Sequence, residues 1–179
     1  MKRILLSVIV LFSFFFAESQ SVAREWNEEV LNAIRNDFAR PTVHARNLFH
    51  TSLAMYEAWS SMDETSETFL LGKTVGEFFC PFDGFSPTEP IEEAREKAIS
   101  YAMYRLISHR FADSPGFDDE ILPSINGLMG SLGYDINFTG LDYSLGDAAA
   151  LGNFIAQELI AFGLQDGSNE ENDYENQFY

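Results

Sequence analysis

Apolar residues recur with a helical period in five stretches of the chain, which span residues 24–39, 41–62, 89–111, 117–132 and 147–162. Residues three and four apart share one face of a helix, so this spacing predicts amphipathic helices. Between the second and third stretches, residues 63–90 contain three glycines and three prolines without a sustained period. The pattern predicts an all-α fold, an antiparallel bundle of about five helices with a long 63–90 connection. Residues 69–71 are expected to form one short extended piece of that connection.

The second stretch carries an expectation about the core. It begins at Pro41, a residue favoured in the first turn of a helix. Its apolar stripe comprises Ala45, Leu48, Phe49, Ser52, Tyr56 and Trp59. Because such a stripe normally faces the protein interior, Phe49 and Trp59 are expected to be core residues.

The later stretches differ in how they should pack. The third is apolar on most sides and is expected to be the most buried helix. The fourth is weaker and is expected to be interrupted at Pro123 and again at Gly127 and Gly130. In the fifth, small residues recur every four positions beside Gly152, and this spacing lets a neighbouring helix approach closely.

Residues 1–19 have the pattern of a secretory signal peptide. A basic start precedes an apolar run from Ile4 to Ala17, which is too short to span a bilayer and remain there. Small residues then precede an expected cleavage site between Ser19 and Gln20. We therefore expect a secreted or periplasmic protein with no stable membrane span after cleavage. An uncleaved anchor is the alternative interpretation.

The chain is strongly acidic, with 11 Lys and Arg residues against 28 Asp and Glu residues and a formal net charge of −17. A polyanion is repelled by nucleic acid and by anionic membrane surfaces, so neither is an expected partner. No Lys or Arg follows Arg110. The single cysteine, Cys80, cannot form an internal disulfide and is expected to be buried and inert.

Three Arg-x-x-x-His pairs fall on predicted helices: Arg40 with His44, Arg46 with His50, and Arg105 with His109. This spacing places both side chains of a pair on the same helix face. The second pair is expected on a solvated polar face, opposite Trp59. The third lies on an apolar side of the most buried helix, where an arginine requires a carboxylate partner.

Asp37 is the candidate partner for that arginine, because it projects between apolar residues of the first predicted helix. Buried together, Asp37, Arg105 and His109 could form an acid/base site. Such clusters are more often structural ties, and Asp37 could instead cap the start of the second helix near Thr42. The sequence assigns no other catalytic residue.

Other common sources of chemistry are absent from the sequence. The histidines and acidic residues show no His-Glu-x-x-His motif, no Glu-x-x-His pair and no calcium-loop spacing, so no metal site is expected. There is also no Gly-x-Ser-x-Gly motif, phosphate-binding loop or dinucleotide fingerprint.

Residues 39–59, ARPTVHARNLFHTSLAMYEAW, resemble the N-terminal helical region of bacterial secreted vanadium-dependent haloperoxidases, relatives of the type 2 phosphatidic acid phosphatases. The resemblance continues through residues 105–110, 132–135, 148–153 and 163–173. It implies a helical N-terminal region over residues 20–163 and an acidic tail over residues 164–179 that leads to a catalytic half further along.

The motifs that hold vanadate or phosphate in that family are missing. They are Lys-x6-Arg-Pro, Ser-Gly-His and Arg-x5-His, whereas here Ala33 stands seven positions before Arg40. The resemblance therefore implies vanadate in the full-length family but no cofactor in this chain, which leaves open whether it is an enzyme. The expected function is a helical scaffold whose partner is a downstream catalytic half or a second copy. A free-standing secreted binding module without catalysis is the alternative.

The acidic tail ends on aromatic residues, Tyr174, Phe178 and Tyr179. Rings in an otherwise solvated segment usually pack against another surface. No groove for them is evident in the sequence, so residues 168–179 are expected to be mobile until a partner docks.

Overall fold

The computed structural model describes residues 21–177. Its α-helices are α2 (Val22–Arg35), α3 (Pro41–Ser60), α4 (Ile91–Arg110), α5 (Leu122–Ser131) and α6 (Ala148–Gly163). The all-α bundle predicted from the sequence is confirmed. The signal peptide expected at residues 1–19 lies outside the described residues, as do Phe178 and Tyr179.

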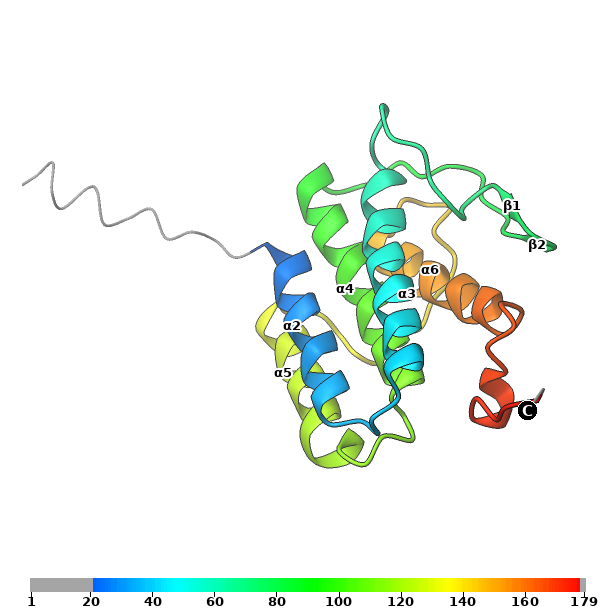
Figure 1. The fold of residues 1–179 in the computed structure, drawn as a ribbon. Helices are drawn as coiled ribbons and strands as arrows, with labels where there is room; N and C mark the ends of the chain where they lie inside the picture. The colour runs from blue at the N-terminus through cyan, green and yellow to red at the C-terminus, as the bar shows by residue number, and fades with distance from the viewer. Residues whose placement is uncertain (1–20, 178–179) are drawn as a thin grey trace, which may run out of the picture.

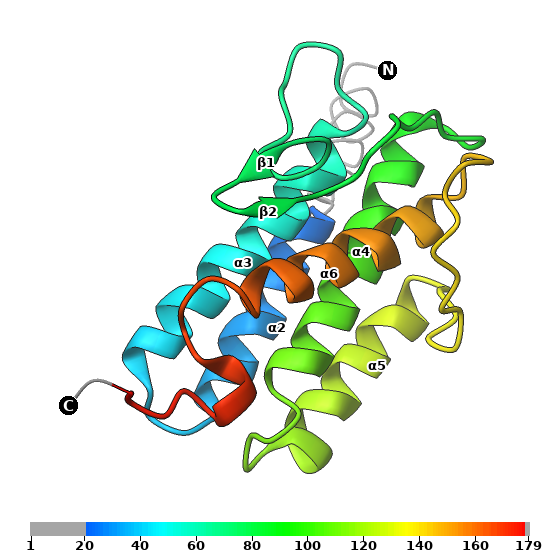
Figure 2. The same cartoon turned by 90° about the vertical axis from the view of Figure 1, so that its right-hand side faces the viewer.

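Helices α2, α3, α4 and α5 alternate in direction, so that each is antiparallel to the next (Figure 1). Helix α6 crosses the face that α3 and α4 form, and the C-terminal segment continues from it toward one end of those helices (Figure 2). Ser21 precedes α2 and caps it, because its side chain accepts a hydrogen bond from the backbone N–H of Arg24. The path of α6 across α3 and α4 brings the end of α6 close to the start of α3 and the end of α4.

Helix α4 is the centre of the bundle, as its apolar sequence predicts. It packs against α2, α3, α5 and α6, and most extensively against α6. A polar tie joins it to α2, where the indole N–H of fully buried Trp26 donates to Ser100 Oγ at 3.0 Å. Because a buried indole N–H needs an acceptor, this bond fixes the register of the two helices.

The close approach of α4 and α6 depends on Gly152. A Cβ atom at this position would lie 2.4 Å from the carbonyl oxygen of Ala98 and 2.7 Å from the Cβ of Tyr101. Neighbouring small residues on α6, Ala148 and Ala156, are also buried. The expectation that this stripe allows tight helix packing is confirmed.

The long connection folds differently from the expectation. Residues 69–71 form turns, and the extended backbone lies instead in a two-stranded hairpin of β1 (Thr74–Val75) and β2 (Phe78–Phe79). A buried carboxylate prevents residues 69–71 from pairing as a strand, since Glu57 of α3 accepts hydrogen bonds from all three of their backbone N–H groups at 2.6–3.0 Å. Cys80 is buried as expected, and burial raises the pKa of its thiol to about 12.

Helix α5 is continuous where the sequence predicted interruptions. Pro123 lies in its first turn, where the missing N–H would have no helical partner, so the proline starts the helix after a π-helical turn at Phe117–Ile121. Gly127 and Gly130 lie within the helix on its exposed side. A helix tolerates them there because nothing else must pack against them.

The close α4–α6 contact gives a first prediction. Gly152→Ala should lower the free energy of unfolding by about 1–3 kcal/mol, because the added methyl group collides with the backbone of α4. Gly127→Ala is the matched control, since nothing lies within 4 Å of the added atom, and it should stabilise the protein by about 0.5–1 kcal/mol. Urea unfolding measures both. Equal effects of the two changes would show that α6 is not held tightly.

Candidate functional site

Helix α3 turns its ionisable side chains inward and its predicted apolar stripe outward. Glu57 and His50 are buried, whereas Phe49 is 50% exposed and Trp59 is 38% exposed. The prediction that Phe49 and Trp59 are core residues is therefore wrong. The opposite face of α3 supplies the core through small and aliphatic residues such as Leu53 and Ala54. With these ionisable side chains buried, the aromatic side chains of the opposite face lie in solvent.

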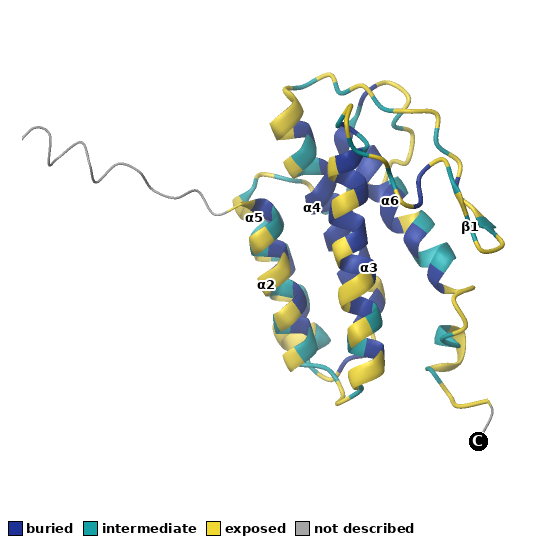
Figure 3. Ribbon diagram, turned by 45° about the horizontal axis from the view of Figure 1, so that its top comes forward, coloured by how far each residue is buried: buried dark blue, intermediate teal, exposed yellow. Residues whose placement is uncertain are grey.

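The exposed side of α3 contains no charged residue. We define the α3 outer face as Leu48, Phe49, Tyr56 and Trp59 with the adjoining Phe69, all of which are exposed. The rings of Phe49 and Phe69 meet edge to face, with their centroids 6.3 Å apart. The exposed residues of α3 are visible along the helix in Figure 3. A contiguous apolar surface of this kind is typical of an interaction site.

A second candidate site lies at the end of the bundle where α3 begins and α4 ends. Arg46 and His50 of α3 approach Arg110 of α4, whose terminal nitrogen donates to His50 Nδ1 at 3.0 Å. His50 is 1% exposed and the side chain of Arg46 is 12% exposed, so the solvated face predicted for this pair is wrong. The reason is that the segment after α6 covers both residues.

Two carboxylates of that segment neutralise the arginines. Glu170 accepts from Arg46 at 2.7 Å and also from Arg110, and its other oxygen lies 3.2 Å from His109 Nε2. Asp166 accepts from Arg46 Nε at 2.5 Å. We call these residues the ion-pair cluster, which comprises Arg46, His50, His109, Arg110, Asp166 and Glu170.

Tyr174 extends the cover over the cluster. Two guanidinium groups contact its ring, with Arg40 5.3 Å and Arg46 5.7 Å from its centroid. Arg40 also donates to Asp173 at 2.7 Å. The described part of the tail thus packs against its own helices, and the prediction that no groove receives its rings is wrong for Tyr174. Two cationic side chains form that groove, which an apolar pattern does not reveal.

The cluster shifts the acidity of its members. Burial of Glu170 opposes ionisation, but the hydrogen bond with His109 and the charges of Arg110 and Arg46 outweigh it and lower its pKa to about 2. Burial lowers the pKa of His50 to about 4, and the charges of Arg110 and Arg46 act in the same direction. His50 is therefore neutral at pH 7. Because its Nδ1 accepts from Arg110, its proton lies on Nε2, 3.6 Å from Asp166.

The structure separates the three residues predicted as a polar cluster. Asp37 contacts His44 at 3.0 Å and accepts from Ser114 at 2.9 Å. Burial opposes ionisation of Asp37, but these hydrogen bonds and the charge of Arg40 lower its pKa. It is not a helix cap either, since no side chain caps the first turn of α3.

Arg105 lies elsewhere and needs no carboxylate. It donates to the backbone carbonyls of Ile136 and Phe138 at 2.8 and 2.7 Å and to Asn153 Oδ1 at 3.0 Å. These neutral acceptors satisfy it, so the ion pair expected with Asp37 does not form. Of the three predicted residues, only His109 contributes to the ion-pair cluster.

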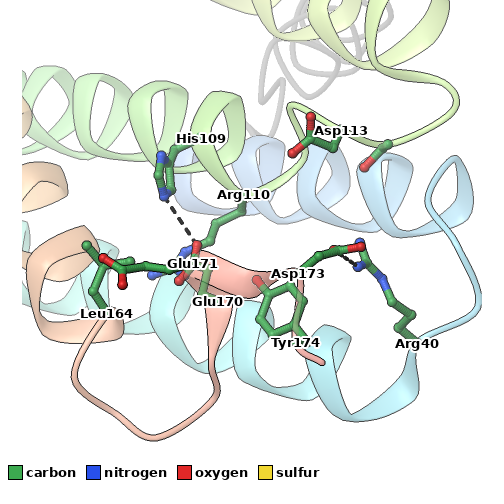
Figure 4. A pocket seen from close by; sticks show the side chains of 10 residues that line it. Arg40, His109, Arg110, Asp113, Leu164, Glu170, Glu171, Asp173 and Tyr174 are labelled. Atoms are coloured by element: carbon green, nitrogen blue, oxygen red, sulfur yellow. Dashed lines mark hydrogen bonds and ion pairs between the residues drawn. The ribbon is translucent and has the colours of Figure 1, made fainter. Parts of the chain in front are cut away.

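A cavity of about 380 Å³ adjoins the ion-pair cluster. Arg40, His109, Arg110, Glu170 and Tyr174 are among the residues that line it (Figure 4). His109 points toward Glu170 across this space, and Asp173 points toward Arg40. The charged side chains of this lining can bind charged groups.

The vanadate-binding motifs of the family that the sequence resembles are absent from this chain, and the ion-pair cluster does not reproduce them. In the present conformation each histidine has a partner: Asp37 for His44, Arg110 for His50 and Glu170 for His109. In residues 21–177, no group of three or more His, Cys, Asp or Glu residues is placed to hold a metal ion. Across the same residues, no helix has both the length and the apolar character needed to cross a membrane. No protein-family model, curated protein or solved structure matches the chain.

The cluster gives a second prediction. A carboxylate with a lowered folded pKa stabilises the fold above its unfolded value, and this contribution is lost as the pH falls through its folded value. For Glu170 that window runs from 4.5 down to about 2. Glu170→Gln should cost about 3 kcal/mol at pH 7, because it leaves buried Arg110 without its carboxylate.

Urea unfolding at pH 7, 4 and 2 tests this expectation. The stability difference between wild type and Glu170→Gln should shrink as the pH falls through the window. The control is Glu67→Gln, which removes the exposed partner of Lys73 and should change stability by less than about 1 kcal/mol at each pH. A pH-independent difference would contradict the assignment.

Proposed function

We propose that this chain is a non-catalytic helical scaffold that docks onto a second domain through the α3 outer face. The observation that carries the proposal is the orientation of α3. A helix that buries Glu57 and His50 among its core residues while exposing Phe49 and Trp59 departs from the usual pattern of a surface helix. A docked partner would restore that pattern by covering the aromatic side chains.

The chemistry of the partner follows from two further features. The resemblance of residues 39–59 favours a catalytic domain of the vanadium-dependent haloperoxidase or acid-phosphatase kind. The net charge of −17 favours a partner surface that is basic, since complementary charge steers association. In this proposal the partner holds the oxyanion and performs the chemistry, in a secreted or periplasmic setting, while this chain supports it.

A free-standing binding module is the second candidate, and a specific observation favours it. The tail segment after α6 does not await a partner for its folding contacts, because Glu170 pairs with Arg46 and Arg110 and Tyr174 covers the cluster. A module whose tail segment already covers the ion-pair cluster could bind a ligand without any catalytic half.

Docking through α3 gives a third prediction. Trp59→Ala should cost about 2 kcal/mol of stability, less than the loss of a fully buried Trp, because the ring is part-exposed and its main polar contact is Arg95, 4.7 Å from the ring centroid. The same change should weaken binding to the separately expressed catalytic half of a secreted vanadium-dependent haloperoxidase by about tenfold or more. Isothermal titration measures the binding.

Leu145→Ala is the matched control, since Leu145 is exposed but lies outside the α3 outer face. It should leave binding unchanged. If the wild-type chain does not bind the catalytic half, or if Trp59→Ala binds as well as wild type, docking through this face is wrong. Sedimentation of the chain alone distinguishes a second copy as the occupant.

A fourth prediction concerns catalysis. The chain alone should show no haloperoxidase or phosphatase turnover, because transition-state stabilisation of an oxyanion needs several preorganised donors with no competing anion. Here Arg46 and Arg110 are already paired with carboxylates. Assays with vanadate and bromide, and with a phosphate monoester, measure this. Turnover that is abolished by a substitution within the chain would overturn the scaffold proposal.

A further inference from the structure

The cationic and the anionic side chains of the ion-pair cluster come from different parts of the chain. Its cationic side chains, Arg46 and Arg110, come from α3 and α4, which pack against each other. Its carboxylates, Asp166 and Glu170, come from the segment that follows α6. Helices α3 and α4 thus carry the groups that bind an anion, and the segment after α6 carries the anionic groups that they bind.

We propose that Arg46, His109 and Arg110 form a binding site for a phosphate-class oxyanion, and that the Glu170 carboxylate occupies this site in the present conformation. The anion takes the place of Glu170 when the segment of residues 164–175 withdraws. The site uses neither the α3 outer face nor any residue of the family motifs. Its test can therefore fail while docking through α3 stands.

The helices hold the donors in place without help from the segment. Arg110 is buried, and it is oriented by neutral His50, which accepts from one of its terminal nitrogens, and by the carbonyl of Leu159 at 3.4 Å. Arg46 donates to the carbonyl of Gly163 at 2.9 Å. Preorganised guanidinium groups of this kind are suited to phosphate oxygens, which they bind through several donors at once.

A glycine at the end of α6 permits the two guanidinium groups to converge. A Cβ atom on Gly163 would lie 2.4 Å from a terminal nitrogen of Arg110 and 2.6 Å from one of Arg46. Each arginine destabilises the charge of the other, and the proximity of Arg46 helps to lower the pKa of Arg110 after the larger effect of burial. Like charges placed this close require a shared anion between them.

A single carboxylate does not use the whole site. Arg110 Nε is buried and has no hydrogen-bond partner in the described part of the chain, and the same holds for Arg40 Nε nearby. The adjoining cavity of about 380 Å³ is lined by His109 and Arg110 of α4 and by residues of the segment itself, so withdrawal of the segment opens it. A tetrahedral oxyanion has more acceptor oxygens than a carboxylate, so it matches the surplus donors.

The segment that supplies Glu170 is suited to withdrawal. Three of its residues, Asn169, Asp173 and Tyr174, have positive φ angles of 49–61°, a region that costs energy for residues other than glycine. Glu170 lies in a single 3₁₀ turn, Glu170–Asn172, rather than in a long helix. Its contacts with the arginines hold the strained backbone in place, so an anion that replaces those contacts releases the strain.

Chemical rescue tests the proposal in the full chain. Glu170→Ala should lower the melting temperature, and inorganic phosphate should restore much of the loss, whereas sodium chloride at matched ionic strength should not. Isothermal titration at pH 7 should show one phosphate bound per Glu170→Ala chain, about tenfold or more tighter than to wild type. Phenyl phosphate in a second titration separates a free oxyanion from a phosphate monoester.

Matched variants decide between a binding site and a structural ion pair. Glu67→Ala removes an exposed carboxylate paired with Lys73 and should gain no phosphate binding. Adding Arg46→Met to Glu170→Ala should abolish the gain. If Glu170→Ala does not fold, Glu170→Gln keeps the side-chain size, and broadening of the phosphorus resonance of phosphate provides the readout. A response of the Glu170 variants no larger than that of Glu67→Ala overturns the proposal.

Discussion

The close approach of α4 and α6 at Gly152 determines the arrangement of the rest of the chain. Because α6 lies directly against the backbone of α4, its last residue, Gly163, reaches the guanidinium groups of Arg46 and Arg110. The segment after α6 then starts beside two cations, and its carboxylates pair with them. A backbone contact in the core thereby positions an ionic cluster about three helical turns further along α6, from Gly152 to Gly163.

Helix α3 shows how a second constraint follows from the first. The end of α6 and the segment after it cover Arg46 and His50, so the face of α3 that carries these two residues is buried. Glu57 is committed to the same side by the backbone N–H groups of Phe69, Leu70 and Leu71. The free energy gained by pairing these polar groups exceeds the gain from burying Phe49 and Trp59, because an unpaired buried charge costs more free energy than an exposed ring.

The local pattern was sufficient to predict the bundle, because each signal belongs to a single helix. These signals are the period of the apolar residues, Pro41 and the small residues around Gly152. It failed where distant segments decide the outcome. The orientation of α3 depends on carboxylates more than a hundred positions away along the chain, as with Arg46 and Asp166. The signal that could have indicated the cluster is charge balance: the acidic segment after Gly163 has no base of its own, so any cationic partner within the chain lies earlier, among its Lys, Arg and His residues.

The α3 outer face also has a kinetic consequence. Two copies of a chain with net charge −17 repel each other at long range, which opposes self-association through this face at low ionic strength. A basic partner experiences the opposite effect and is steered toward the same surface. Its association rate would fall as salt screens the attraction, while its residence time would depend on the contacts of Trp59 and Phe49. The acidic surface thus selects the partner, and the aromatic residues determine how long it stays.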